Sequence, residues 1–307
     1  HLHDHMLGWV EPAGTELIPV LCDIRDKKKL KALIAKYKPQ VVYHAAAHKH
    51  VPILEDWPEE AVKTNVIGTN NLLKAIRGID IERFVLISTD KTVDPKGVMG
   101  ASKRMAEMLV QSAADTNTSG CIYSSVRFGN VLGSRGSVVP TFMEQIRAGG
   151  PVTITDERMT RYFMTIGEAV QLVLQASALA EHGEVFVLDM GQPVRIVDLA
   201  HRMIRLGGLV PGRDIEVKTV GARPGEKLVE ELAHGPLLAS SHPQINIATA
   251  TVPQPEVLED HVRELKKMST SGGRQELKEF LLALANHERP EVITIDLREP
   301  SEVRQWI

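Results

Sequence analysis

The chain has 307 residues, 43% of them hydrophobic and 24% charged, which is enough for a large buried core and for one or two domains. Its formal net charge of −3 shows no basic surplus, which argues against nucleic acid as a partner. The two cysteines, Cys22 and Cys121, form no metal or disulfide pattern and fit a reducing compartment.

No apolar run reaches the ~18 residues of a membrane-spanning helix, and we find no signal peptide. The chain begins at His1 without an initiator methionine, which we interpret as a ragged start and not as a histidine metal site. We expect a cytoplasmic protein, or one at the cytoplasmic face of the inner membrane if an anchor precedes residue 1.

Short apolar strands alternate with amphipathic helices over the first half of the chain. The sequence predicts a buried strand over residues 17–22 and a helix over 27–38 with Asp26 as its N-cap. Further strands are expected over 41–45, 84–88 and 122–128, separated by helices over 59–76 and 102–114. Because each strand is apolar almost throughout, this order indicates a parallel sheet covered by helices on both faces.

The pattern becomes less regular after about residue 149. We predict a helix over 165–179, a strand over 184–188, a helix over 196–206 and a turn over 223–226. From about residue 253 the chain is charged and helical, with a linker over 269–273. We therefore divide the chain into a first sheet domain (1–148), a second region that returns elements to the sheet (149–252) and a helical tail (253–307).

Polar and small residues follow the predicted strands. Asp23 follows the first strand, and residues 44–47, 88–91 and 128–130 follow the next three. Parallel sheets bind ligands at the carboxyl ends of their strands, so we expect these residues to form one site.

The glycine-rich turn of a dinucleotide-binding sheet is not found in this sequence. Such a turn follows the first strand and lets the backbone approach a pyrophosphate. No G-x-x-G-x-x-G or G-x-G-x-x-G precedes Asp23, and Gly129, Gly133 and Gly136 follow a later strand. If the fold is of this kind, we expect its first strand, first helix and second strand to lie ahead of residue 1, and the isolated chain to bind a dinucleotide poorly.

Thr89-Asp90-Lys91 directly follows a predicted strand, and Met99 and Lys103 are spaced to share one helix face. A tyrosine-x-x-x-lysine dehydrogenase helix uses such a lysine to hold the nicotinamide ribose, but Met99 stands at the tyrosine position and has no acidic proton. An acid and a base must then come from elsewhere, and Asp90 and Lys91 are adjacent candidates. The alternative is that both are surface charges of a loop, and their place at a strand end favours the catalytic interpretation.

The run over residues 88–104 resembles one group of extended short-chain dehydrogenase/reductases, the polysaccharide-biosynthesis enzymes that dehydrate UDP-N-acetylglucosamine at carbons 4 and 6. Blocks at 44–52, 65–69, 127–131, 160–164, 188–191 and 221–227 continue the resemblance over about residues 17–248. Met99 is similar to the branch with methionine in place of tyrosine. The resemblance implies an incomplete Rossmann-type, doubly wound α/β fold, with a partial NAD-binding domain over 1–148 and a nucleotide-sugar-binding region over 149–252.

The resemblance also implies a mechanism. NAD takes a hydride from sugar carbon 4, the resulting ketone acidifies the proton on carbon 5, the carbon 6 hydroxyl leaves as water, and the hydride returns to carbon 6. Thr89 would bond the carbon 4 oxygen, Asp90 would protonate the departing hydroxyl and Lys91 would remove the carbon 5 proton. Lys103 would hold the nicotinamide ribose, and no residue is identified that takes the proton of the 4-hydroxyl.

Further contacts follow from the same resemblance. NAD would contact Asp23, Ile24, Ala45, Ala46, Ala47, Lys49 and Asn65. The UDP-sugar would contact Asn130, Thr153, Arg161, Arg223 and Glu226, because the guanidinium forks suit a diphosphate. His44, His48 and His50 point to different faces around a strand end and are not expected to bind metal. We expect a homo-oligomer.

Two alternatives remain open. A nucleotide-sugar 4-epimerase of the same fold would return the hydride to carbon 4, but such enzymes usually keep the tyrosine that Met99 replaces. A truncated, catalytically inactive remnant would bind the nucleotide sugar without turning it over.

Overall fold

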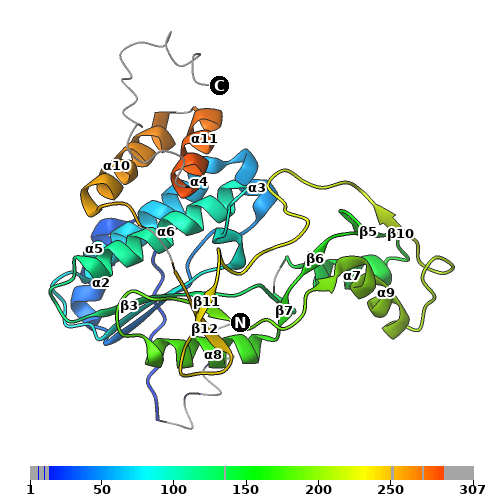
Figure 1. Cartoon of the computed structure of the whole chain (residues 1–307), viewed down its shortest axis with the longest axis horizontal. Helices are drawn as coiled ribbons and strands as arrows, with labels where there is room; N and C mark the ends of the chain where they lie inside the picture. Colours follow the sequence, from blue (N-terminus) through cyan, green and yellow to red (C-terminus); the bar gives the residue numbers. More distant parts are fainter. Residues whose placement is uncertain are drawn as a thin grey trace.

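The computed structural model describes residues 14–134, 136–249, 252–271 and 273–286, together with Met6 and Val10. A main part built on one sheet carries a smaller part at its side and a pair of C-terminal helices above it (Figure 1). The histidines at residues 1, 3 and 5 lie outside the described residues.

A six-stranded sheet forms the centre of the main part, in the order β1-β2-β3-β8-β12-β11. Four neighbouring strands are parallel, which confirms the predicted sheet: β1 (Val41–His44), β2 (Arg83–Ile87), β3 (Ile122–Arg127) and β8 (Val185–Leu188). The antiparallel strands β12 (Ile245–Ala248) and β11 (Leu237–Ala239) extend it beyond β8. The carboxyl ends of the four parallel strands therefore share one edge of the sheet.

Helices cover both faces of this sheet, as expected for a doubly wound α/β fold. α5 (Thr69–Ile76) and α6 (Val98–Asp115) lie on one face, with α2 (Lys27–Tyr37) packed against α5, and α8 (Ile166–Leu179) lies on the other face (Figure 1). The largest apolar cluster fills the space under α5 and α6 and includes Phe84, Met105 and Leu281.

Local capping sets where several helices begin. The Asp26 side chain accepts from the backbone N–H of Lys29 and caps α2, as predicted. Thr165 and Glu168 bond each other's backbone N–H and form a capping box at the start of α8. The predicted helix over 59–76 is a continuous run of α4 (Pro58–Ala61), a π-helical segment (Val62–Gly68) and α5.

The smaller part lies beside the carboxyl end of the sheet (Figure 1). It contains α7 (Val138–Arg147), α9 (Ile196–Leu206) and the parallel pair β5 (Val152–Ile154) and β10 (Val217–Thr219), around a core of its own. Two short pairs lie between the parts, namely β4 (Asn130–Val131) with β7 (Phe163–Met164) and β6 (Thr160–Arg161) with β9 (Val194–Arg195). Neither α7 nor these short strands were predicted.

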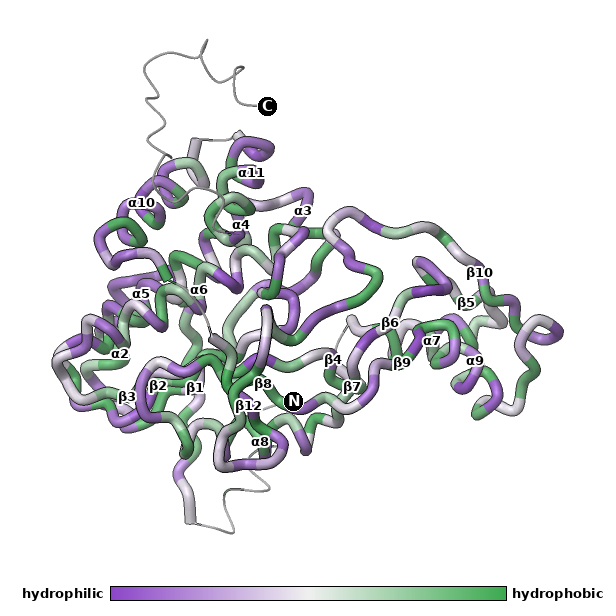
Figure 2. Tube along the Cα trace, in the orientation of Figure 1, coloured by the Kyte–Doolittle hydropathy of each residue, from purple (hydrophilic) through white to green (hydrophobic). Residues whose placement is uncertain are grey.

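The C-terminal helices α10 (Pro255–Ser271) and α11 (Arg274–Ala285) pack on α6 and on the helical run that precedes it. Figure 2 shows hydrophobic and hydrophilic residues alternating along both helices, as expected of helices with one buried side. The predicted linker over 269–273 is wrong for Ser269, Thr270 and Ser271, which continue α10. Their hydroxyls donate to backbone carbonyls three residues earlier, which satisfies them within the helix.

The predicted buried strand over 17–22 is wrong. Residues 15–23 form no strand, and Leu21 is 90% exposed. Among the described residues β1 is the outermost strand at its end of the sheet, and this segment does not pair with its open edge. No helix within the described part of the chain is both long and apolar enough to cross a membrane.

Candidate functional site

The segment after β2 forms the centre of the site. Thr89 Oγ1 donates to Asp90 Oδ1 at 2.8 Å, and Lys91 Nζ donates to the same oxygen at 2.9 Å and to Asn130 Oδ1 at 3.3 Å. Thr89 also caps the short 3-10 turn Asp90–Thr92, which directs Asp90 inward, where 1% of it is exposed. Hydroxyl, carboxylate and amine thus meet within hydrogen-bonding distance at one strand end.

A cavity of about 500 Å³ lies at the carboxyl ends of β1, β2 and β3. The structure brings eleven of the predicted site residues together along its wall: Ala45, Ala47, Lys49, Thr89, Lys91, Met99, Lys103, Asn130, Arg161, Arg223 and Glu226. They come from the loop after β1, the end of β2, helix α6, the end of β3 and the 223–226 turn. Asp90 lies behind Lys91, to which it is bonded.

Five predicted contacts do not line this cavity. Asp23 forms an ion pair with Arg25 at 2.7 Å, and Ile24 packs against Gly68. Ala46 is absent from the lining, and Thr153 lies on β5, where its side chain bonds Gln145. Asn65 is 1% exposed.

Asn65 instead fixes the cavity wall from behind. Its amide accepts from the His48 N–H at 2.8 Å and donates to the His48 carbonyl at 3.0 Å and to Ser102 Oγ at 2.9 Å. These bonds tie the loop after β1 to α6, so Asn65 positions the wall and presents no polar group to the cavity.

Helix α6 places Met99 and Lys103 on the wall. Lys103 Nζ donates to the carbonyl of Ile87 at 2.6 Å. Burial lowers the pKa of this ammonium to about 8, against the opposing charge of Glu107. The hydrogen bond to Ile87 therefore fixes the Lys103 ammonium group at the end of β2.

A buried ion cluster supports the cavity from below and was not predicted. The Glu107 carboxylate accepts from Ser88 Oγ at 2.7 Å and from Arg127 Nη2 and Nε at 2.7 and 2.8 Å, and it pairs with Arg104 at 3.2 Å. Burial alone would raise the pKa of Glu107, but Arg127 and its other partners hold it at about 2. The cluster locks α6 to the ends of β2 and β3. Its sequence signal is the spacing of Lys103 and Glu107, which places both on one helix face.

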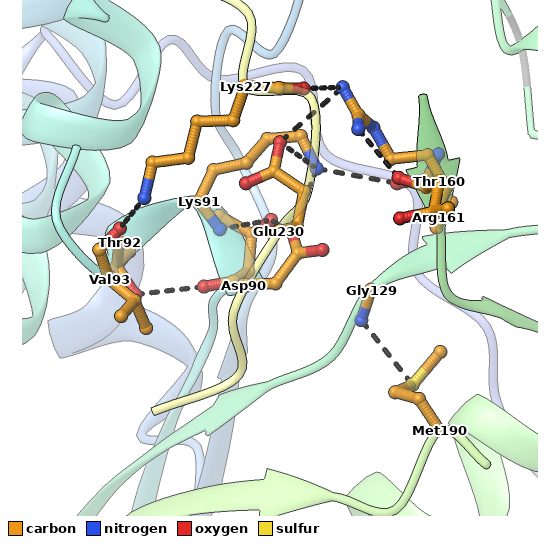
Figure 3. A network of polar contacts seen from close by, with 12 residues as sticks. Asp90, Lys91, Thr92, Val93, Gly129, Thr160, Arg161, Met190, Lys227 and Glu230 are labelled. Carbon is orange, nitrogen blue, oxygen red and sulfur yellow. Dashed lines mark hydrogen bonds and ion pairs between the residues drawn. The ribbon is translucent and has the colours of Figure 1, made fainter. Parts of the chain in front are cut away.

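Arg161 fastens the segment after the 223–226 turn over the cavity. Its guanidinium donates to the carbonyls of Thr160, Lys227 and Leu228 at 2.7, 2.8 and 3.2 Å (Figure 3). Lys227 Nζ donates to the Val93 carbonyl at 2.8 Å on the opposite side. The turn with Arg223 and Glu226 is thus tied to both parts of the molecule.

Glu230 is a cavity residue that the sequence analysis missed. It is 4% exposed and lies 3.7 Å from Lys91 Nζ and from Arg161 Nη2 (Figure 3). Glu231 is adjacent, chemically identical and exposed, so no sequence signal distinguishes the two. Among the residues that the structure describes, no group of three His, Cys, Asp or Glu side chains could hold a metal ion.

The chain is similar to known proteins in both sequence and structure. A family model described as polysaccharide biosynthesis protein matches residues 10–250. The capsular polysaccharide biosynthesis protein CapD of Staphylococcus aureus is 55% identical over 217 residues, which cover 71% of this chain and 36% of CapD. The chain thus spans about a third of the length of this curated relative.

Two solved structures share the fold. Pen from Bacillus thuringiensis has a TM-score of 0.71 and 30% sequence identity, covering 85% of this chain and 86% of Pen. DesIV, a dTDP-glucose 4,6-dehydratase from Streptomyces venezuelae solved with NAD and TYD bound, has a TM-score of 0.61 and 21% identity, covering 69% of each chain. The likeness to DesIV supports the fold alone.

Proposed function

Because the chain belongs to the polysaccharide biosynthesis protein family, we propose that it is a nucleotide-sugar 4,6-dehydratase that works with NAD. We further propose a UDP-N-acetylhexosamine as the substrate, with UDP-N-acetylglucosamine as the first candidate. The single observation that carries the proposal is the Thr89-Asp90-Lys91 cluster at the cavity wall, with Lys103 close by and Met99 at the tyrosine position.

The residues present fit the nicotinamide end of NAD. Ala45 and Ala47 line the cavity with small side chains that leave room for a flat ring. Lys103 places its ammonium group at the end of β2. The sequence has no glycine-rich turn before Asp23, so we assign no contact to the pyrophosphate. Bound NAD would supply the acceptor, and later the donor, of one hydride.

Three side chains then carry the proton chemistry. Thr89 bonds the oxygen on sugar carbon 4, and Lys91 takes the proton from carbon 5 once a ketone at carbon 4 has made it acidic. The proton of the 4-hydroxyl can pass through Thr89 to Asp90, which gives it to the carbon 6 hydroxyl, so that this group leaves as water. Lys91 then returns its proton to carbon 5. Since Asp90 contacts both Thr89 and Lys91, it can exchange protons with either group between steps.

The nucleotide end is assigned to the opposite wall. Arg223 lines the cavity and offers its guanidinium to a diphosphate, and Glu226 can accept from a ribose hydroxyl. Arg161 adds positive charge to the same wall, although its Nη atoms already donate to backbone carbonyls. Thr153, on β5 in the smaller part, remains our proposal for the uracil edge.

Isotope tracing tests the proposed function. We expect incubation with NAD and UDP-N-acetylglucosamine deuterated at carbon 4 to give a sugar that has lost one water and carries the deuterium at carbon 6, by mass spectrometry and NMR. In heavy water, unlabelled substrate should gain solvent deuterium at carbon 5. A galacto-configured product would overturn the proposal in favour of an epimerase, and UDP binding by calorimetry without any turnover would favour an inactive remnant.

Replacement of Lys91 tests the role of the base. We expect Lys91→Met to lower kcat by roughly 10²–10⁴-fold, the range typical of general acid–base groups. The matched control is Lys96→Met, since Lys96 belongs to the same loop and is exposed. Equal turnover in both variants would contradict the assignment of Lys91.

A further inference from the structure

The segment after the 223–226 turn presents one buried carboxylate, Glu230, to the cavity. Its Oε1 atom lies 3.7 Å from Lys91 Nζ and 3.7 Å from Arg161 Nη2, so it bridges the strand-end cluster and β6. Figure 3 shows the three side chains pointing toward one another from different elements. Glu230 therefore contacts a residue of the proposed chemistry while lying on the substrate side of the cavity.

Lys91 Nζ is held between two carboxylates. Asp90 Oδ1 is 2.9 Å from it on one side, and Glu230 lies on the other. The second oxygens of both carboxylates, Asp90 Oδ2 and Glu230 Oε2, are buried and have no hydrogen-bond partner among the described residues. A buried carboxylate oxygen without a partner is costly, so two of them beside one amine indicate a place that receives a proton or a hydroxyl group.

The charges around Glu230 come from several elements. Burial raises the pKa of its carboxyl and the Asp90 charge raises it further, while Lys91, Arg161 and Lys227 oppose the rise. The remaining charged or titratable groups that line the cavity are Lys49, Lys103, Arg223, Glu226, His48 and His50. Of all these groups, Asp90 and Glu230 are the two carboxylates paired with Lys91 within 4 Å among the described ion pairs.

We propose that Glu230 is a positioning residue that holds the Lys91 amine against Asp90 and sets its state of protonation. The proposal rests on the dehydratase function, in which Lys91 must lose its proton to act as a base. The negative charge of a carboxylate 3.7 Å away acts on the Lys91 amine, so Glu230 as well as Asp90 determines how that amine is held. Glu230 thereby links the position of the 223–230 segment to the state of the Lys91 amine.

NMR of lysines reductively methylated with ¹³C tests this coupling in the ligand-free chain. The Lys91 signal is identified by its loss in Lys91→Arg, and its titration is followed with pH. We expect Glu230→Gln, which keeps the shape and removes the charge, to change the Lys91 midpoint from that of the wild type. Glu230→Asp, which keeps the charge, should restore most of the wild-type midpoint.

The matched control is Glu231→Gln, because Glu231 is the adjacent, exposed carboxylate. An unchanged Lys91 midpoint in Glu230→Gln would overturn the proposal, and so would an equal shift in Glu231→Gln. Circular dichroism of each variant shows that the comparison is made between folded proteins.

The measurement requires no turnover, so its outcome is separate from that of the proposed function. If the wild type dehydrates a sugar nucleotide, the ascending limb of its pH–kcat profile should move in Glu230→Gln together with the Lys91 midpoint. An inactive wild type with a clear NMR shift would reject the dehydratase and retain the Glu230–Lys91 coupling. An active wild type without the NMR shift would retain the dehydratase and reject the Glu230–Lys91 coupling.

Discussion

His44 ends β1 as a buried neutral side chain. It is 3% exposed, and its Nε2 atom lies 2.9 Å from Thr69 Oγ1. Because Thr69 Oγ1 already donates to the Asn65 carbonyl at 2.6 Å, it accepts from His44, which therefore carries its proton on Nε2. Burial, with a smaller contribution from Lys103, lowers the pKa of His44 to about 3.

Because His44 is buried in its neutral form, we predict that the fold is sensitive to acid. The histidine pKa is lower in the folded state than in the unfolded state, so its contribution to stability is present above about pH 6.5 and is lost as the pH falls toward 3. We expect the free energy of unfolding to fall by up to about 1.4 kcal/mol per pH unit in that window. Urea unfolding between about pH 5 and 7 should show a flatter dependence in His44→Gln than in the wild type. The exposed His182→Gln should keep the wild-type slope.

At the scale of single elements, α6 is the helix on which the candidate site depends, and distant residues fix it at its start and near its middle. Its N-cap residue, Gly97, offers no side chain, and the Glu55 carboxylate of α3 (Val51–Asp56) accepts from the Val98 N–H at 2.7 Å instead. Farther along, Glu107 ties the helix to β2 and β3. The position of Met99 and Lys103 is therefore set by tertiary contacts.

Removal of the Glu107 charge should loosen this helix. We expect Glu107→Gln to lower the free energy of unfolding by about 3–5 kcal/mol, because the buried Arg127 loses its carboxylate partner. Denaturant unfolding measures the change, and Asp115→Asn, an exposed carboxylate on the same helix, is the control. The folded pKa of Glu107 is depressed, so the difference should persist above about pH 4.5 and shrink as the pH falls toward 2. A loss as small as that of the control would show that the cluster contributes little.

At the scale of the whole molecule, the C-terminal helices support the site from outside. Lys278 of α11 pairs with Glu55, and Asn286 donates to the Pro95 carbonyl at 3.2 Å, so α11 contacts the loop that leads into α6. Leu281 is fully buried between α11 and the core. The helices α10 and α11 are thus part of the main fold.

A cavity under α11 should affect the loop that leads into α6. We expect Leu281→Ala to cost about 2–5 kcal/mol and to speed amide hydrogen exchange in α11 and in residues 93–103. Leu282→Ala, at the partly exposed neighbouring position, should have a smaller effect on both. Unchanged exchange in residues 93–103 alongside faster exchange in α11 would show that the tail does not support the loop.

The open side of β1 predicts association between chains. Val41 and Tyr43 are 39% and 44% exposed on the outermost parallel strand of the described sheet. Uncovered strands with apolar side chains pair readily, and a charge on the strand opposes this. We expect sedimentation velocity to show concentration-dependent association that Tyr43→Lys reduces. Tyr37→Lys, at a similarly exposed tyrosine on α2, should leave association as in the wild type.

The local pattern of residues determined most of the elements and predicted the place of the candidate site. Apolar runs predicted β1, β2, β3 and β8, and Asp26 marked the start of α2, because these signals depend on neighbours in sequence. The position of residues 88–91 after a strand was enough to expect a site there. Their roles in catalysis stay predictions.

Tertiary structure decided what depends on distant partners. Residues 17–22 are apolar yet form no strand, because a strand forms only by pairing with another strand, and this segment pairs with none among the described residues. α6 begins at Val98, four residues before the predicted start, because Glu55 provides the cap. Glu230 is buried and Glu231 is exposed only through the way their segment crosses the cavity. Whether a charged side chain is buried, and which partner it meets, are properties of the folded chain. Together they determine the free-energy cost of burying that charge.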